Sequence, residues 1–190
     1  MAREKPQLET TRLILRLPEA ADAPALACYA IEERAFLAPW GPVRPDAYYT
    51  EDHWQQQPAT QLQNFLEDKG LLLFAFDREN PAQVHGRVSF SNFVRGAFHA
   101  CHLGYELRRR SQGKGLMHEA LEAAIAYAFA ELNLHRIQAN YMPRNERSAR
   151  VLEKLGFVIE GRARAYLLIN GVWEDHVLTS LTNPRWRPPA

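Results

Sequence analysis

The stretch Arg110-Ser111-Gln112-Gly113-Lys114-Gly115 decides the fold, because it joins a strand-like segment to the strongest helical pattern in the chain. Upstream, residues 99–107 have the length and composition of a strand. Downstream, residues 115–132 contain one apolar stripe with helical spacing, formed by Met117, Leu121, Ala124, Ile125, Ala128 and Leu132. Glycines in such a turn let the backbone direct its N–H groups towards one point, and the helix N-terminus adds about half a positive charge. The stretch therefore predicts a cradle for a phosphate or pyrophosphate.

A purely structural strand-to-helix turn would have the same glycine pattern, and this alternative stays open. The stretch is not a Walker loop, since G-x-x-x-x-G-K-[ST] is absent, and it is not the G-x-G-x-x-G dinucleotide fingerprint. The motifs that surround the stretch distinguish between these alternatives.

The rest of the chain alternates between strand and helix signals. Pro18 closes the first strand, Thr50 can cap the second helix, and Asn145 can cap a helix that Gly156 ends. Asn170-Gly171 is the dipeptide most typical of a tight hairpin. The expected order is β-α-α-β-β-β-α-β-α-β-β, with strands at residues 13–17, 71–76, 84–93, 99–107 and 136–141 and on both sides of the hairpin, and helices at 19–33, 50–68, 115–132 and 145–156.

Length and composition favour one globular domain. A chain of 190 residues with 46% hydrophobic and 24% charged residues is close to the globular average and can bury a proper core. We expect a single domain over residues 1–190, with its core at about 8–182 and a proline-rich tail at 184–190.

The charge and cysteine counts exclude several classes of protein. Lys and Arg number 23 against 22 Asp and Glu, so the net charge of +1 predicts no sequence-specific nucleic-acid partner. Cys28 and Cys101 form neither a disulfide framework nor a metal site, which favours the reducing cytoplasm. Residues 1–6 are charged and no run of about 18 apolar residues occurs, so we expect neither a secretory signal nor a membrane span. The scattered histidines follow no ligand pattern, so we expect no metal.

Further motifs accompany the glycine stretch. Arg110-x-x-Gly113-x-Gly115 is followed by a long helix, a strand, Asn145-x-x-Ser148 and Lys154-Leu155-Gly156-Phe157. This series resembles the acetyl-CoA-binding core of the GNAT acetyltransferases. The opening Leu8-Glu9-Thr10-Thr11-Arg12-Leu13-Ile14-Leu15-Arg16 is similar to the branch that acetylates the N-termini of ribosomal proteins. The resemblance implies an α/β GNAT fold: a mixed, mostly antiparallel twisted sheet flanked by helices, whose splayed central strands hold acetyl-CoA.

The same resemblance implies a set of cofactor contacts. Main-chain N–H groups from Arg110 to Gly115 would hold the pyrophosphate, Leu107 and Arg109 would present main-chain groups to the pantetheine, and Asn145 would lie near the pantetheine end. Asn145 is also a favoured helix N-cap. Lys114 and the arginine run 108–110 would help to hold the cofactor phosphates, with a solvated face as the alternative for the run. The remaining contacts are expected from Arg110, Ser111, Gln112, Gly113, Lys114, Gly115, Leu116 and Met117.

Two residues are candidates for acid–base roles by the same resemblance. Glu106 precedes the loop on the strand where GNAT enzymes often keep a base, and alternation puts it on the face of His102 and Gly104. Ser148 resembles the residue proposed to protonate the leaving sulfur. The alternatives are an exposed strand carboxylate and an ordinary first-turn serine. Leu152 stands where many GNAT proteins have a tyrosine acid, which excludes a phenolic acid at that position.

Transfer of an acetyl group to an N-terminal amine needs little general acid–base catalysis. An α-amino group has a pKa of about 7.7–8.0, so its deprotonation at pH 7 costs only about 1–1.4 kcal/mol. A thiolate leaving group with a pKa of about 8.5 needs limited protonation, so positioning of the reactants can supply much of the rate. Tyr105, on the opposite strand face from Glu106, is expected to be a packing residue.

The acceptor is expected to enter from the side opposite the cofactor. Segment 36–49 has too many prolines and glycines for regular structure, and with the second helix and the hairpin it would form the walls. The resemblance implies the N-terminal alanine of a small-subunit ribosomal protein, free or in a pre-ribosome. A small-molecule amine acceptor and a non-catalytic acetyl-CoA-binding module for ribosome assembly are the alternatives. Candidate wall residues, with packing as the alternative for each, are Trp40, Tyr141, Tyr166 and Trp173.

Overall fold

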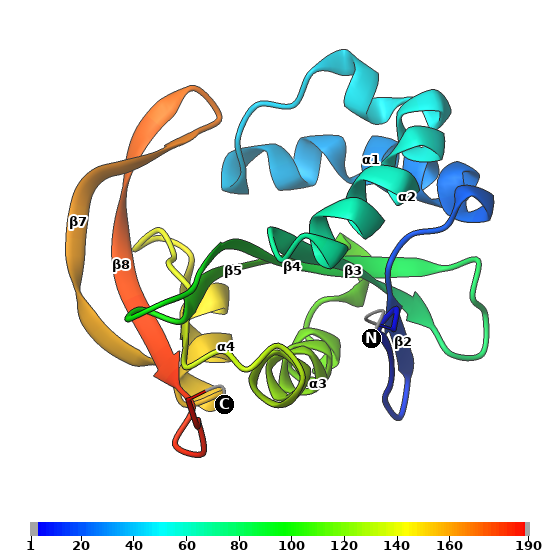
Figure 1. The fold of residues 1–190 in the computed structure, drawn as a ribbon. Helices are drawn as coiled ribbons and strands as arrows, with labels where there is room; N and C mark the ends of the chain where they lie inside the picture. Colours follow the sequence, from blue (N-terminus) through cyan, green and yellow to red (C-terminus); the bar gives the residue numbers. More distant parts are fainter. Residues whose placement is uncertain (1–3, 189–190) are drawn as a thin grey trace.

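The computed structural model describes residues 4–188, so the first three residues of the charged N-terminal segment and the last two of the tail lie outside the described part. An eight-stranded sheet has the order β1-β2-β3-β4-β5-β6-β8-β7 (Figure 1). Its strands are β1 (Gln7–Glu9), β2 (Leu13–Arg16), β3 (Gly70–Asp77), β4 (Val84–Val94), β5 (Ala100–Leu107), β6 (Arg136–Gln138), β7 (Val158–Ile169) and β8 (Val172–Thr182). The helices are α1 (Ala23–Leu37), α2 (Glu51–Leu66), α3 (Leu116–Ala130) and α4 (Glu146–Lys154).

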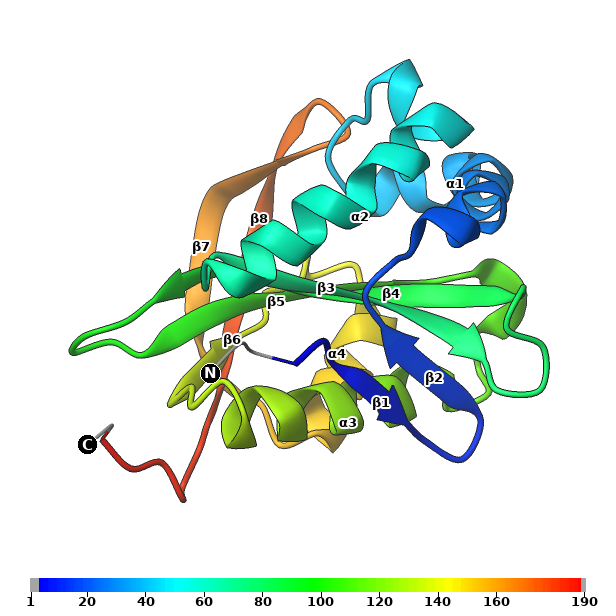
Figure 2. The ribbon, with the colours of Figure 1, turned by 45° about the vertical axis from the view of Figure 1, so that its right-hand side comes forward.

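Helices cover both faces of the sheet, with α1 and α2 on one face and α3 and α4 on the other (Figure 2). The central strand β3 shows why. Leu73 and Ala75 pack in the core cluster that includes α3, whereas Phe74 and Phe76 pack in the cluster with α1 and α2. Successive strand side chains point to opposite faces, so this uninterrupted apolar strand is buried on both sides.

The helix and turn signals in the sequence are confirmed. Thr50 caps α2 by accepting a hydrogen bond from the N–H of His53 at 3.3 Å. Asn170 (φ 46°) and Gly171 (φ 82°) form the tight turn between β7 and β8. The whole predicted apolar stripe is buried in the core: Met117, Leu121, Ala124, Ile125, Ala128 and Leu132.

The sheet parts between β5 and β6, as the resemblance predicted. These two strands are parallel and pair only over Ala100–His102 and Arg136–Gln138. Beyond that point β5 continues to Leu107 beside β4, while the chain after β6 follows β8 through the Tyr141–Val177 bridge. All other neighbouring strands are antiparallel. One edge of β5 is therefore left without a strand partner from about residue 103 onward.

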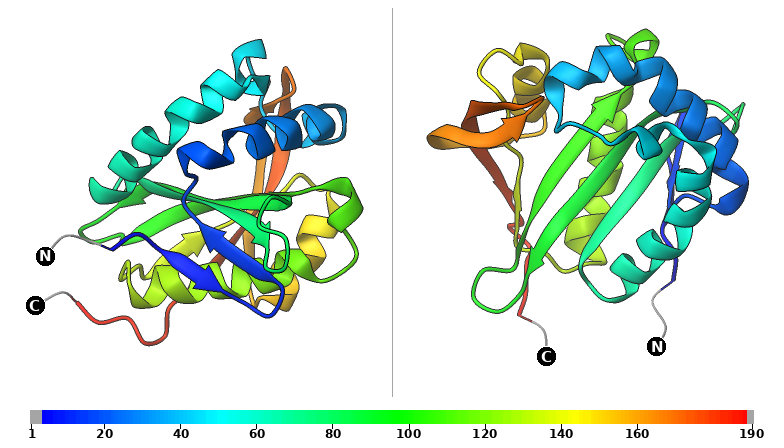
Figure 3. Two further views of the ribbon diagram at one scale, coloured as in Figure 1. Left: turned by 90° about the vertical axis from the view of Figure 1, so that its right-hand side faces the viewer. Right: turned by 90° about the horizontal axis from the view of Figure 1, so that it is seen from above.

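The β7–β8 hairpin bends across the end of this parting (Figure 3). Its tip reaches the loop that follows α1, where the N–H of Asn170 donates to the carbonyl of Gly41 at 3.0 Å. That loop contains two short 3₁₀ turns, Ala38–Trp40 and Asp46–Tyr49, within the segment expected to lack regular structure.

Some boundaries differ from the sequence expectation. Strand β1 was not predicted, because three residues next to Pro6 carry too weak a pattern, yet it pairs with β2. The strand expected at 136–141 ends at Gln138, since the chain diverges from β5 there. The described part of the tail is docked by Trp186, whose indole N–H donates to the carbonyl of Asn133 at 3.2 Å. Within residues 4–188, no helix has the length and apolarity to cross a membrane.

Candidate active site

An open cleft of about 800 Å³ lies where β5 leaves β6. The end of β5, the glycine loop with the start of α3, and the start of α4 form its walls. A second hollow towards α1 shares Phe36, Trp40, Gln112, Gly113 and Arg147 with it. Several residues predicted for cofactor binding line the cleft: Leu107, Gln112, Gly113, Gly115, Leu116, Met117 and Asn145.

The backbone of the glycine loop presents free donors to this cleft. Gly113 (φ 74°) and Gly115 (φ 77°) both adopt the left-handed conformation that side chains disfavour. Among residues 4–188, no main-chain N–H from Gly113 to His118 has a hydrogen-bond acceptor in the protein. This follows from helix geometry, since the first N–H groups of a helix have no partner within it. The arrangement suits an anion with several oxygens.

The donor groups lie further along the chain than the sequence suggested. The N–H of Ser111 already donates to the carbonyl of Arg108 at 2.9 Å, and that of Gln112 donates to the carbonyl of Arg109 at 3.2 Å. Both groups are used to close the turn at residues 109–111. The main-chain N–H groups of Ser111 and Gln112 are therefore not free to bind an anion, whereas those of residues 113–118 are.

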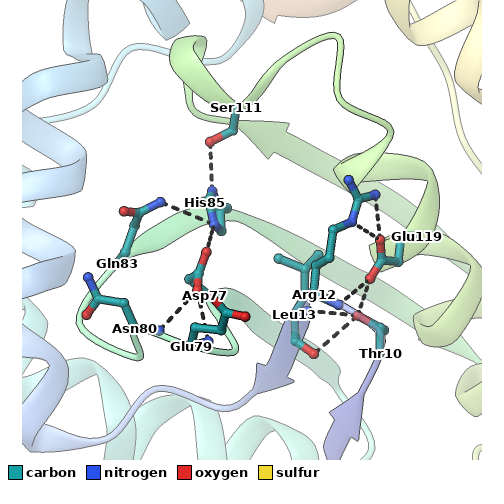
Figure 4. A network of polar contacts seen from close by, with 10 residues as sticks. All are labelled: Thr10, Arg12, Leu13, Asp77, Glu79, Asn80, Gln83, His85, Ser111 and Glu119. Carbon is teal, nitrogen blue, oxygen red and sulfur yellow. Dashed lines mark hydrogen bonds and ion pairs between the residues drawn. The ribbon is translucent and has the colours of Figure 1, made fainter.

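Two sets of side-chain contacts hold the loop from behind (Figure 4). The Ser111 hydroxyl is turned away from the cleft and lies 2.7 Å from Nδ1 of the buried His85. Arg12, from the turn before β2, donates to the carbonyl of Lys114 at 2.8 Å and pairs with Glu119 on α3. The opening motif of the sequence is thus used to fix the start of α3.

The arginine run 108–110 is not a uniform solvated face. Arg108 is buried and pairs with Glu32 at 3.2 Å and with Glu33 at 3.6 Å on α1. The main-chain N–H of Arg109 donates to the Glu33 carboxylate at 3.0 Å, so it is already occupied. The side chains of Arg109, Arg110 and Lys114 are exposed. The basic side chains that line the cleft itself are His118, Arg144, Arg147, Arg150 and Lys154.

Ser148 and Tyr105 face each other in the cleft. Their hydroxyl oxygens are 2.6 Å apart, and the Ser148 N–H donates to the Asn145 side chain at 3.2 Å. Asn145 is therefore the N-cap of α4 as well as a residue of the cleft wall. Burial raises the pKa of Tyr105 to about 12, so its phenol keeps its proton at neutral pH. Tyr105 was expected only to pack, and its contact with Ser148 could not be read from strand parity.

Glu106 lies on the opposite face of β5, towards α1, and also lines the cleft. Its carboxylate accepts from Arg87 on β4 at 2.9 Å and from the Tyr29 hydroxyl on α1 at 3.3 Å. Burial opposes the charge on Arg87, but the Glu106 carboxylate together with Tyr48 and Tyr29 outweighs this effect, so the pKa of Arg87 is raised. The expected exposed carboxylate is thus a half-buried one held in a polar cluster.

The predicted acceptor residues are divided between the cleft and the hairpin. Trp40 lines the cleft, and the guanidinium of Arg144 lies 5.3 Å from the centre of its ring. Trp173, on the hairpin, is 62% exposed. The Tyr166 hydroxyl accepts from Asn140 at 3.3 Å. Tyr141, which lies after β6, is partly buried and packs against the core cluster.

Arg144 connects the loop after α1 to the β7–β8 hairpin and was missed by the sequence reasoning. It donates to the carbonyl of Pro39 at 3.3 Å and to Glu174 on β8 at 2.7 Å. No local sequence pattern distinguishes Arg144 from the other arginines of the chain. Within the described residues, no group of three or more His, Cys, Asp or Glu side chains is arranged to hold a metal ion.

The parted mixed sheet with a donor cradle at the parting is the arrangement of the acyl-CoA N-acyltransferase fold, which confirms the predicted fold class. A model of the acetyltransferase (GNAT) domain matches residues 12–158, so the chain belongs to the GNAT acetyltransferase family.

Relatives with known names are similar over nearly the whole chain. The [ribosomal protein uS5]-alanine N-acetyltransferase of Escherichia coli is 47% identical over 184 residues, which cover 97% of this chain and 94% of that one. The crystal structure of a ribosomal-protein-S5-alanine acetyltransferase from Vibrio fischeri has a TM-score of 0.91 and 42% identity, covering 96% and 100% of the two chains. RimJ of Mycobacterium smegmatis, at 24% identity and a TM-score of 0.84 over 95% and 88%, shares the fold.

Proposed function

We propose that this protein transfers the acetyl group of acetyl-CoA to the N-terminal alanine amine of ribosomal protein uS5. The observation that carries the proposal is the 47% identity, over 97% of the chain, to an Escherichia coli enzyme named for that reaction. The cleft supports it independently, because it offers an anion cradle and two polar groups on neighbouring positions of β5.

The residues of the glycine loop suit the pyrophosphate of acetyl-CoA. Unpaired N–H groups from Gly113 to His118 can donate to phosphate oxygens without any change in the helix. Arg147 and Arg150 on the cleft wall add positive charge on the same side. The free edge of β5, ending at Leu107, leaves main-chain groups available to an extended pantetheine arm. Acetyl-CoA supplies the activated thioester.

Glu106 is the proposed base. A free α-amine loses its proton at a pKa of about 7.7–8.0, so a carboxylate acting directly or through a water is sufficient. The Arg87 and Tyr29 contacts fix the carboxylate at the cleft wall. The deprotonated amine then attacks the thioester carbon and forms the C–N bond. The nitrogen gives its second proton to water, and the tetrahedral intermediate collapses as the C–S bond breaks and the thiolate is released.

Ser148 is the proposed acid for that thiolate. Its hydroxyl oxygen lies 2.6 Å from the Tyr105 hydroxyl. When the protonated Tyr105 donates to Ser148, the Ser148 hydrogen is free to point into the cleft. Leu152 occupies the position where many GNAT proteins have a tyrosine acid, so that acid is missing in this chain. The Tyr105–Ser148 pair offers a proton donor in its place.

The acceptor is proposed to reach Glu106 between the loop with Trp40 and the β7–β8 hairpin. Arg144 and the Asn170–Gly41 hydrogen bond hold these two walls together. Such an acceptor is made in the cytoplasm, and Cys28 and Cys101, free thiols of the described part, fit that compartment.

Intact mass spectrometry tests the proposal. Unacetylated small-subunit ribosomal proteins are incubated with the protein and acetyl-CoA, and N-terminal peptides are then mapped. We expect one added acetyl group on uS5, at its N-terminal alanine, and none on a control uS5 whose amine has been blocked beforehand. Thiol release with small amines but not with uS5 would assign a small-molecule acceptor instead. Binding of acetyl-CoA without transfer to any amine would contradict an enzymatic role.

A further inference from the structure

A chain of three side chains, of which His85 and Ser111 are buried, runs behind the glycine loop (Figure 4). Nε2 of His85 on β4 lies 3.0 Å from the carboxylate of Asp77 at the end of β3. Nδ1 of the same ring lies 2.7 Å from the hydroxyl of Ser111, which belongs to the turn that opens the loop. The chain joins the β3–β4 turn to the loop across 34 residues of sequence, and the function proposed above does not use it.

The Asp77 end of this chain is rigid. Its carboxylate accepts from the N–H groups of Glu79 at 2.9 Å and of Asn80 at 3.0 Å. Hydrogen bonding to His85, together with these backbone contacts, lowers the pKa of Asp77 despite some opposing desolvation. A carboxylate can only accept, so Nε2 of His85 carries a hydrogen in this arrangement. In the neutral ring, Nδ1 is then the acceptor for the Ser111 hydroxyl.

The chain is not a nucleophilic triad. Ser111 is 2% exposed and His85 is 6% exposed, and the Ser111 hydroxyl points away from the cleft. A catalytic serine must reach a substrate carbonyl, and no substrate can reach this one. The His85–Ser111 contact therefore affects the conformation of the protein and not a substrate.

The Ser111 end lies two residues before the first glycine of the cradle. The main-chain N–H of Arg108 donates to the carbonyl of His85 at 2.7 Å, so His85 holds the turn at both ends, by backbone and by side chain. A Cβ at the neighbouring Gly86 would lie 2.2 Å from the carbonyl of Glu106, which shows how closely β4 supports the end of β5 here. Loss of the side-chain contact would leave a buried hydroxyl unpaired and free the turn to move.

We propose that the Asp77–His85–Ser111 chain is a positioning device that sets the glycine loop in the conformation that binds the pyrophosphate of acetyl-CoA. His85 and Ser111 are positioning residues, because they act through the loop and touch no reacting atom. The inference rests on the proposed function, since it takes acetyl-CoA as the ligand of the loop.

Binding and kinetics of four variants test the inference. We expect His85→Phe and Ser111→Ala each to raise the Kd for CoA and the KM for acetyl-CoA about threefold to tenfold, the range produced by loss of one hydrogen bond. The value of kcat should stay within about twofold, because the groups at the reacting centre are unchanged. The double variant should bind no more weakly than His85→Phe, because both changes remove the same contact. His85→Asn places a polar atom near the position of Nδ1 and should restore part of the affinity.

Asp22→Asn is the matched control for stability. Asp22 forms a half-buried pair with Arg16 at 2.7 Å, away from the cleft-lining residues. The Asp22→Asn substitution should lower the unfolding temperature at least as much as Ser111→Ala does. The Kd for CoA should stay unchanged in this control. If Ser111→Ala and His85→Phe alter stability as the control does and leave the Kd for CoA unchanged, the inference is wrong. If His85→Phe does not fold, Ser111→Ala decides alone. A wild-type protein that binds no CoA would overturn the proposed function, and the inference with it.

Discussion

The two sides of the cleft are built in different ways. On the proposed cofactor side, main-chain N–H groups at the start of α3 face the cleft, and contacts from the turn before β2 and from β4 hold the loop from behind. On the proposed acceptor side, exposed side chains and single hydrogen bonds join a loop to a hairpin tip, and Trp173 and Trp40 are 62% and 39% exposed. A phosphate group is recognised by fixed donors, so that side needs a rigid backbone, whereas the acceptor side can change with the substrate.

The largest effect is expected from Gly113→Ala. A side chain at this left-handed position (φ 74°) would strain the loop and turn donor N–H groups away from the ligand. Loss of one or two charge-assisted hydrogen bonds predicts a fall in kcat/KM for acetyl-CoA of about 30-fold to 100-fold. Steady-state kinetics measures it. Gly96→Ala is the control, because Gly96 has φ 71° and the same open surroundings but lies in the β4–β5 turn. An equal fall in kcat/KM in both variants would show that backbone strain alone, and not the loss of donor N–H groups, causes the effect.

A smaller effect is expected from Tyr105→Phe. The change removes the hydroxyl that contacts Ser148 and should lower kcat about tenfold with little change in the KM for acetyl-CoA. Because the pKa of Tyr105 is raised to about 12, the wild-type rate should show no loss from its deprotonation between about pH 7 and 10. Ser148→Ala should reproduce the fall, and the double variant should add little. If kcat of the double variant were a further tenfold below that of Ser148→Ala, the two residues would act independently.

On the proposed acceptor side we expect a substitution to change the KM for only one of the two substrates. Trp173→Ala removes a large exposed ring from the hairpin and should raise the KM for a uS5 N-terminal peptide about fivefold, a typical cost for one contact residue. The KM for acetyl-CoA, measured in the same assay, should stay the same. If both values rise together, the two sides of the cleft are coupled rather than independent.

The smallest effect is expected at the surface of the acceptor-side loop. Asp46 pairs with Arg34 at 2.9 Å, but their side chains are 91% and 54% exposed. Asp46→Asn should change the free energy of unfolding by less than about 0.5 kcal/mol, because exposed pairs contribute little. Denaturant unfolding measures this change. Asp22→Asn, which breaks a more buried pair, should cost clearly more, and equal costs would show that exposure is not the deciding factor.

The parts of the molecule predicted from sequence depend on local chemistry. The apolar stripe of α3, the Thr50 and Asn145 caps and the Asn170-Gly171 turn each follow from neighbouring residues, and each is observed. The parting of β5 and β6 came from the resemblance to a known family and is also observed.

The parts that could not be predicted join residues far apart in the chain. Nothing near Tyr105 indicates that its hydroxyl meets Ser148, and nothing near Arg87 indicates its contact with Glu106. The position of the donor cradle also depends on which N–H groups the preceding turn consumes, and that is set by the turn's three-dimensional geometry. Arg108 was misjudged for a similar reason, because its carboxylate partners come from α1.

Hydrogen exchange with and without ligands tests the two-sided account most directly. The account predicts that CoA slows exchange of the amides from Gly113 to His118, which have no acceptor in the described protein, and leaves the hairpin tip around Asn170 unchanged. A uS5 N-terminal peptide, added to the CoA complex, should then slow exchange at the hairpin tip and in the loop with Trp40. Protection of the hairpin by CoA alone, or none at residues 113–118, would contradict the account.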